Sequence, residues 1–138
     1  MTRCLQQQQV RSVLDVGCGS GTHLALLEQQ GFQVEGVDLN EAMLQVARGK
    51  VKGSLHQSDM AHLSLSKTFD AILCLFAAFN HNLKLEGAQQ TLHRFSQHLN
   101  PQCYLPLGSL HYHPVYSASR HNPSRSLFNA SFSHGRNA

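Results

Sequence analysis

The stretch Val13-Leu-Asp-Val-Gly-Cys-Gly-Ser-Gly21 decides the fold of this chain. An apolar run ends at Asp15 and Val16, three glycines follow at every second position, and a helical pattern begins at once. Glycine permits positive φ angles and lets the backbone approach a ligand closely. A helix N-terminus presents free N–H groups and a partial positive charge. The stretch therefore predicts a strand, a tight turn and a helix that cradle a polar or anionic small molecule; the alternative is a tight turn without a ligand.

The spacing of the glycines narrows the class of ligand. Dinucleotide sites read G-x-G-x-x-G, whereas Gly17, Gly19 and Gly21 follow the order G-x-G-x-G, with Asp15 two residues earlier. A carboxylate there suits a ligand with an ammonium and a sulfonium group and would repel a pyrophosphate. The pattern resembles motif I of the class I S-adenosylmethionine (SAM) dependent methyltransferases. A nicotinamide-dependent oxidoreductase is the alternative that this spacing and this acid disfavour.

Length and composition indicate a single globular domain. The chain has 138 residues and is 41% hydrophobic, which is enough for one core. Neither a run of ~18 apolar residues nor an apolar signal segment is visible, so no membrane span and no secretion are expected. The four cysteines are scattered without a C-x-x-C pair, which favours the reducing cytoplasm and argues against a metal site.

Charge is distributed unevenly along the chain. All eight acidic residues lie between Asp15 and Glu86, and residues 1–110 carry equal numbers of basic and acidic side chains. The formal net charge of +3 therefore comes from the last 28 residues. A nucleic-acid-binding domain carries a clustered basic face, and no such cluster is visible. We expect no nucleic-acid partner.

The order of predicted elements is that of an α/β protein with a Rossmann-like parallel sheet and helices on both faces. Gly31 is a suitable stop for the first helix, Asn40 a suitable cap for the second, and Pro106 indicates an edge or an early end of the last strand. Right-handed crossovers place the ligand at the carboxyl ends of the strands. Strands are expected at residues 11–16, 32–38, 54–60, 68–76 and 102–107, and helices at 20–30, between Asn40 and Gly49, and at 86–99.

Asp38 ends the second predicted strand, 23 residues after Asp15. A carboxylate in this place can accept hydrogen bonds from both hydroxyls of a ribose, as the acid that follows the glycines of a dinucleotide site does. The alternative is a surface acid or one that caps the next helix.

Further motifs strengthen the resemblance to class I methyltransferases. By that resemblance, Asp59 accepts from the adenine amino group, Met60 contacts the adenine ring, and Leu75 contributes backbone near the methionine part of SAM. Met43 covers adenine from the second helix or is only a core residue. Asp70 begins its strand and is therefore expected at the edge away from the ligand.

Two runs, residues 31–44 and 55–60, are similar to small-molecule enzymes of this superfamily, above all to amino-sugar N-methyltransferases. The likeness covers roughly residues 11–101. It implies SAM as cofactor, a small-molecule acceptor and methyl transfer as the reaction. The expected cofactor-binding residues are Asp15, Gly17, Gly19, Gly21, Asp38, Leu39, Met43, Asp59, Met60 and Leu75.

The catalytic group is harder to identify. Methyl transfer from SAM needs mainly positioning, and a general base only when the acceptor holds its proton tightly. His81 follows the fourth strand and is the candidate base; the alternative is an exposed loop histidine.

The ends of the chain depart from the family pattern. We expect a polar, frayed lead-in at residues 1–11, a SAM-binding domain at 12–107, and a tail at 108–138 without regular structure. The likeness stops after Pro101, which predicts a C-terminally truncated or altered core that lacks the terminal strand hairpin. The alternative function is a non-catalytic module that binds SAM or binds a protein partner, or a second copy, through an exposed sheet edge.

Overall fold

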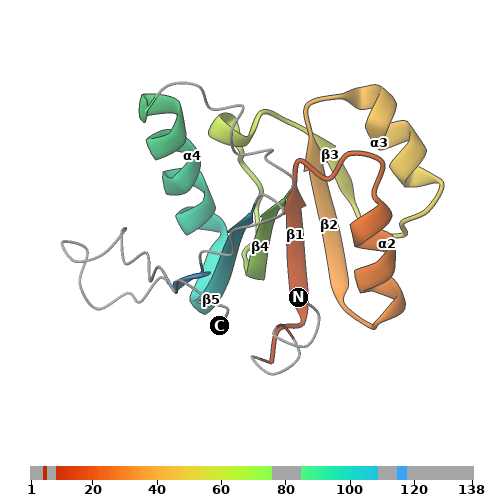
Figure 1. The fold of residues 1–138 in the computed structure, drawn as a ribbon, viewed down its shortest axis with the longest axis horizontal. Helices are drawn as coiled ribbons and strands as arrows, with labels where there is room; N and C mark the ends of the chain where they lie inside the picture. Colours follow the sequence, from red (N-terminus) through yellow and green to blue (C-terminus); the bar gives the residue numbers. More distant parts are fainter. Residues whose placement is uncertain (1–4, 6–8, 76–84, 109–114, 118–138) are drawn as a thin grey trace, which may run out of the picture.

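The computed structural model describes residues 5, 9–75, 85–108 and 115–117 (Figure 1). Its strands form one sheet in the order β3-β2-β1-β4-β5-β6, in which β1 to β5 are parallel and β6 is antiparallel to β5. The strands are β1 (Ser12–Val16), β2 (Gln33–Asp38), β3 (Leu55–Gln57), β4 (Phe69–Leu75), β5 (Leu99–Gly108) and β6 (Val115–Ser117). The helices are α2 (Thr22–Gln29), α3 (Glu41–Arg48), the 3-10 helix η1 (Met60–His62) and α4 (Leu85–His98). The predicted Rossmann-like α/β class is confirmed.

Helices cover both faces of the sheet (Figure 1). Side chains of a strand alternate between faces, so Val13 and Leu14 of β1 enter different core clusters. Val13 packs with Leu24 of α2 and Leu44 of α3, and Leu14 packs with Phe95 of α4. All five side chains are fully buried, and each such burial stabilises the fold by about 1.5–3 kcal/mol.

The helix boundaries follow the expected local signals. Gly31 has φ 90° just after α2, a left-handed conformation that ends a helix at little cost for glycine. The Asn40 side chain accepts a hydrogen bond from the Ala42 amide at 3.0 Å and caps α3, and Gly49 follows the last residue of that helix. The predicted stop and cap are confirmed.

Three features of the ends differ from expectation. Leu5 and Val10 in the lead-in are buried in the core cluster of α2 and α3, so these two residues are packed rather than frayed. β5 begins at Leu99, directly after α4, and includes Pro101. Pro106 lies in β5 opposite Val115, an inner strand rather than an edge, because a proline loses only its own N–H and keeps its carbonyl acceptor.

β6 lies in the segment 108–138, where no regular element was expected, and its pairing with β5 adds a terminal antiparallel pair that the predicted core lacked. A strand of three residues is too short to produce a detectable alternation of apolar side chains. The division into lead-in, domain and tail stays a prediction. Within the described part of the chain, no helix is long and apolar enough to cross a membrane.

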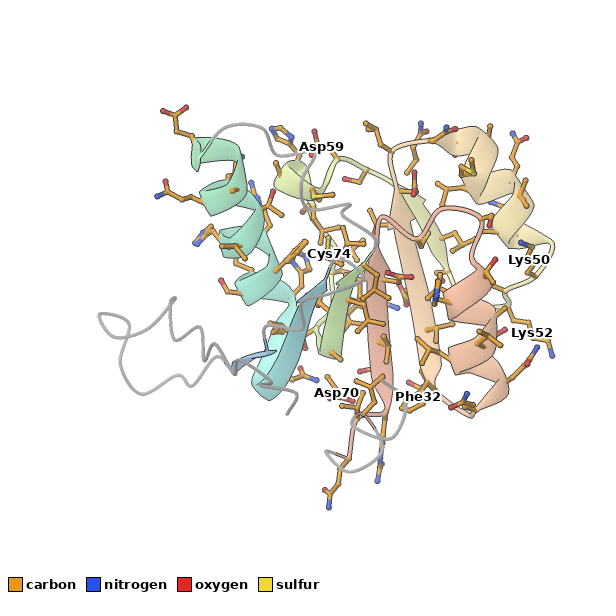
Figure 2. The ribbon with its side chains drawn as sticks, in the orientation of Figure 1. Phe32, Lys50, Lys52, Asp59, Asp70 and Cys74 are labelled. Atoms are coloured by element: carbon orange, nitrogen blue, oxygen red, sulfur yellow. The ribbon has the colours of Figure 1, made fainter. Side chains whose placement is uncertain are left out.

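Asp70 ties the strands together at the N-terminal edge of the sheet. Its carboxylate accepts hydrogen bonds from the amides of Arg11 and Ser12 at 2.9 Å, from the Ser12 hydroxyl at 3.0 Å and from Asn100 Nδ2 at 2.7 Å. Figure 2 shows Asp70 at one end of the sheet and Asp59 at the other. Asp70 therefore joins β1, β4 and β5 on the edge opposite to the expected ligand.

We predict that Asp70→Ala lowers the free energy of unfolding by about 2 kcal/mol at pH 7, because two backbone amides lose a charged acceptor.

Partial burial acts to raise the pKa of Asp70, but hydrogen bonds from Asn100, Ser12 and Arg11 outweigh it and hold the pKa below the ordinary 3.8. The stabilisation is thus present above about pH 4 and is lost as the pH falls through the lower, folded-state pKa. Urea unfolding of wild type and Asp70→Asn from pH 7 to pH 3 should show their difference shrinking; a constant difference would contradict this.

Candidate cofactor site

The glycine loop, residues 17–21, connects β1 to α2 at the C-terminal edge of the sheet (Figure 1). Gly17, Gly19 and Gly21 have φ angles of 79°, 54° and 73°, a region in which side chains of L-residues are strained. The amides of Gly17 and Cys18 donate to the Val37 carbonyl at 2.7 and 3.0 Å. The loop is therefore held against the end of β2.

Two of these glycines serve different needs. A Cβ at Gly21 would lie 2.8 Å from Cβ of Ala47, so Gly21 allows α2 and α3 to pack closely. A Cβ at Gly19 would meet nothing within 4 Å. Gly19 therefore leaves open space beside the backbone at the point where a ligand was expected.

Asp38, the last residue of β2, lies in direct contact with the glycine loop. Its Oδ2 accepts from the Gly19 amide at 2.7 Å, and its Oδ1 accepts from the Asn40 amide at 2.8 Å. The side chain that caps α3 is that of Asn40, so the helix-capping alternative for Asp38 does not hold. Asp38 is half-buried, and its carboxylate is oriented at the rim of the loop.

Asp15 is a buried carboxylate beneath this loop. Its side chain is only 3% exposed, and its Oδ1 has no hydrogen-bond partner among the described residues. Burial, with a further contribution from the charge of Asp38, raises the pKa of Asp15 to about 7. A buried polar atom without a partner is costly, and a cationic or donor group of a ligand would remove that cost. The site thus fits a ligand that carries an ammonium group.

Cys18 and Gly36 contribute to the site and were missed by sequence reasoning. Burial first, then the charges of Asp15 and Asp38, raise the pKa of the Cys18 thiol to about 12. Cys18 is therefore a neutral, unreactive side chain that adds no negative charge. Gly36 lies opposite Asp15 on β2, and a Cβ there would lie 2.6 Å from Leu24 Cδ1, 2.7 Å from Leu55 Cδ2 and 2.8 Å from the Cys18 sulfur, so Gly36 allows α2, β3 and the glycine loop to pack closely on β2. A glycine at position 36, in a strand that otherwise needs apolar side chains, was the signal in the sequence that could have indicated this close packing.

Asp59 lies at the same edge of the sheet, where β3 leads into η1 (Figure 2), and Met60 is the first residue of η1. Asp59 Oδ1 accepts from the Ala61 amide at 2.8 Å and caps η1, and Oδ2 is 3.8 Å from Nδ1 of His62. Met60 packs against the core cluster of α4. The expected adenine acid is therefore also a helix cap, a role that the sequence pattern did not indicate.

The remaining expected residues come from α3 and β4. Leu39 and Met43 are 68% and 45% exposed, so Met43 is a surface residue and its core alternative is wrong. Leu75, the last residue of β4, packs partly buried against the core cluster of α2 and α3. His81 lies outside the described residues.

Within the described part of the chain, no group of three or more histidine, cysteine or acidic residues is arranged to hold a metal ion.

The buried Asp15 leads to a prediction about pH. Its pKa of about 7 in the folded chain exceeds the ordinary 3.8, so the folded chain binds more protons between those values and loses stability as the pH rises through them. Relative to wild type, Asp15→Asn should gain about 2 kcal/mol of stability between pH 5 and pH 8.

Urea unfolding of both proteins at the two pH values measures this gain. Glu41→Gln, at a partly exposed acid of α3 that pairs with Arg48, is the control and should show no such change. A stability difference between Asp15→Asn and wild type that is equal at pH 5 and pH 8 would contradict the assignment.

Comparisons with known proteins agree with this geometry. The sequence profile described as "Methyltransferase domain" matches residues 13–102. The chain is 37% identical over 91 residues to dTDP-3-amino-3,6-dideoxy-alpha-D-glucopyranose N,N-dimethyltransferase of Streptomyces fradiae, covering 65% of this chain and 36% of that protein. It is 33% identical over 94 residues to dTDP-3-amino-3,4,6-trideoxy-alpha-D-glucopyranose N,N-dimethyltransferase of Streptomyces venezuelae, covering 67% and 40%. The chain thus spans less than half the length of these relatives.

Solved structures give the same result. SAM-bound CalS10, an amino pentose methyltransferase from Micromonospora echinaspora, has a TM-score of 0.70 and 34% identity, covering 75% of this chain and 47% of that one. The sugar N-methyltransferase KedS8 from Streptoalloteichus has a TM-score of 0.70 and 31% identity, covering 75% and 43%. The resemblance predicted from the sequence is confirmed, and the chain belongs to the methyltransferase domain family.

Proposed function

We propose that this chain binds SAM at the C-terminal edge of its sheet and takes part in methyl transfer to a small-molecule acceptor of the amino-sugar class. The observation that carries the proposal is the buried Oδ1 of Asp15, which has no partner among the described residues and lies beneath the glycine loop. Its chemistry suits the ammonium of SAM. The acceptor class is supported by the relatives, which are named as methyltransferases of amino sugars.

The polar half of the cofactor would lie over the glycine loop. Asp15 would receive the ammonium group, and the open side of Gly19 would admit the ligand next to the backbone. Asp38 would accept from the ribose hydroxyls. Each oxygen of its carboxylate has one protein donor and a further lone pair to offer. Leu75 would provide backbone for the methionine part.

The adenine half would lie between α3 and η1. Leu39 and Met43 expose apolar surface on the α3 side, and covering such surface is favourable by about 25 cal/mol per Å². Asp59 Oδ2 accepts no hydrogen bond of ordinary length from His62, which is 3.8 Å away. It would accept from the adenine amino group, with Met60 beside the ring.

Bound SAM supplies an activated methyl group on a sulfonium. The residues of the chain would then act by orienting the cofactor and fixing its position relative to the acceptor. The candidate base His81 stays a prediction, since it lies outside the described residues. The cytoplasmic location and the contact with a protein partner or a second copy through a sheet edge also stay predictions.

Calorimetric titration with S-adenosylhomocysteine (SAH), which keeps the ammonium, ribose and adenine groups, tests the proposal. We expect binding by wild type, and an affinity at least about 30-fold lower for Asp38→Ala, because two hydrogen bonds to the ribose are lost. Glu41→Gln changes a partly exposed acid of α3 that pairs with Arg48 and should bind like wild type. Circular dichroism would verify that each variant is folded.

Absence of SAH binding by folded wild type, or equal binding by Asp38→Ala, would contradict the proposed site. NADH serves as the probe for the oxidoreductase alternative and should not bind. A gain of one methylene in the mass of an amino-sugar nucleotide incubated with SAM and the chain would exclude the non-catalytic alternative.

A further inference from the structure

His98, the last residue of α4, is 5% exposed and uses both ring nitrogens. Nδ1 lies 2.7 Å from the Arg94 carbonyl oxygen, and Nε2 lies 2.9 Å from the amide nitrogen of Leu65. A carbonyl only accepts a hydrogen bond and a backbone amide only donates one. Nδ1 therefore carries the proton, Nε2 is the bare acceptor, and the ring is a neutral imidazole of one defined tautomer.

Leu65 belongs to the segment that leads from η1 to β4. Leu63 and Leu65 of this segment, together with Met60 of η1, pack in the same core cluster as Phe95 of α4. Figure 1 shows η1 beside α4, and the two elements are in contact. The segment is thus held to α4 by apolar contacts and by the hydrogen bond to His98.

These two kinds of contact constrain the segment differently. Apolar burial is non-directional, so it favours contact between the segment and α4 without choosing one register. A hydrogen bond is directional, and the bond from Leu65 to His98 fixes where the segment lies along α4. The amides that follow Asp59 belong to the turn that precedes this segment: Ala61 donates to Asp59 Oδ1 at 2.8 Å and His62 donates to the Asp59 carbonyl at 3.0 Å.

We propose that His98 is a positioning residue for the adenine side of the cofactor site. Its imidazole anchors Leu65 and thereby holds η1, with Asp59 and Met60, at the edge of the sheet. The proposal rests on the proposed function, which assigns adenine to Asp59. Its consequence is that a buried histidine on the far end of α4 sets the preference for the 6-amino group of the cofactor.

Three variants test the proposal. His98→Leu keeps an apolar side chain and removes the acceptor, whereas His98→Gln keeps an amide oxygen that can accept from Leu65. His93→Leu is the control, an exposed histidine of the same helix. The measurements are amide hydrogen exchange of the wild type and each variant, and titration with SAH and with S-inosylhomocysteine, which lacks the 6-amino group.

For His98→Leu we expect exchange about tenfold faster at Leu65, Ala61 and His62, SAH affinity about tenfold lower, and a reduced preference for SAH over S-inosylhomocysteine. His98→Gln should restore the exchange rates, the SAH affinity and the preference for SAH, and His93→Leu should match wild type. Faster exchange confined to Leu65, or an unchanged preference in folded His98→Leu, would overturn the proposal.

The two proposals fail in distinguishable ways. If wild type does not bind SAH, the proposed function is wrong. Amide exchange at Ala61 and His62, compared between wild type and His98→Leu, then decides by itself whether His98 positions η1. If His98→Leu does not fold, the nitrogen-15 signals of wild-type His98 decide: a bare Nε2 at neutral pH, together with rescue by His98→Gln, supports the proposal, and a protonated Nε2 overturns it.

Discussion

The structure depends on one constraint: the carboxylate of Asp15 is buried at the end of β1, and one of its oxygens has no partner among the described residues. Burial and the nearby charge of Asp38 both disfavour its ionised form. Cys18, the neighbouring side chain in the glycine loop, stays neutral and adds no further negative charge. Asp15 is therefore only partly ionised near neutral pH, and a cationic ligand beside it would favour the ionised carboxylate.

The two edges of the parallel sheet use their carboxylates differently. At the N-terminal edge, Asp70 uses its carboxylate fully, with donors from the start of β1 and from β5. At the C-terminal edge Asp15 and Asp38 lie near each other, and Asp38 accepts hydrogen bonds from the loop amide of Gly19 and the amide of Asn40. The same residue type therefore joins strands at one edge of the sheet and lies at the other edge beside the glycine loop, outside the carboxyl ends of the strands, where open parallel sheets bind their ligands.

Much of this arrangement was predictable from local patterns. The glycine spacing predicted β1, the turn and α2. The signals at Gly31 and Asn40 predicted the ends of the helices to within one or two residues. Features without a period or a local signal were not predictable. These are the three residues of η1 that make Asp59 a cap, the start of β5 at Leu99, and the antiparallel β6. Contacts between distant segments, such as Leu65 with His98, depend on tertiary packing, as does the missing partner of Asp15.

Titration of the Asp15 carboxyl carbon by NMR tests the central claim that this carboxylate is held without a partner and suits a cationic ligand. Without ligand, we expect a midpoint near pH 7. With saturating SAH, the midpoint should move to lower pH, because the ammonium group favours the ionised carboxylate. An ordinary midpoint near pH 4 without ligand, or a midpoint that SAH leaves unchanged, would contradict the account.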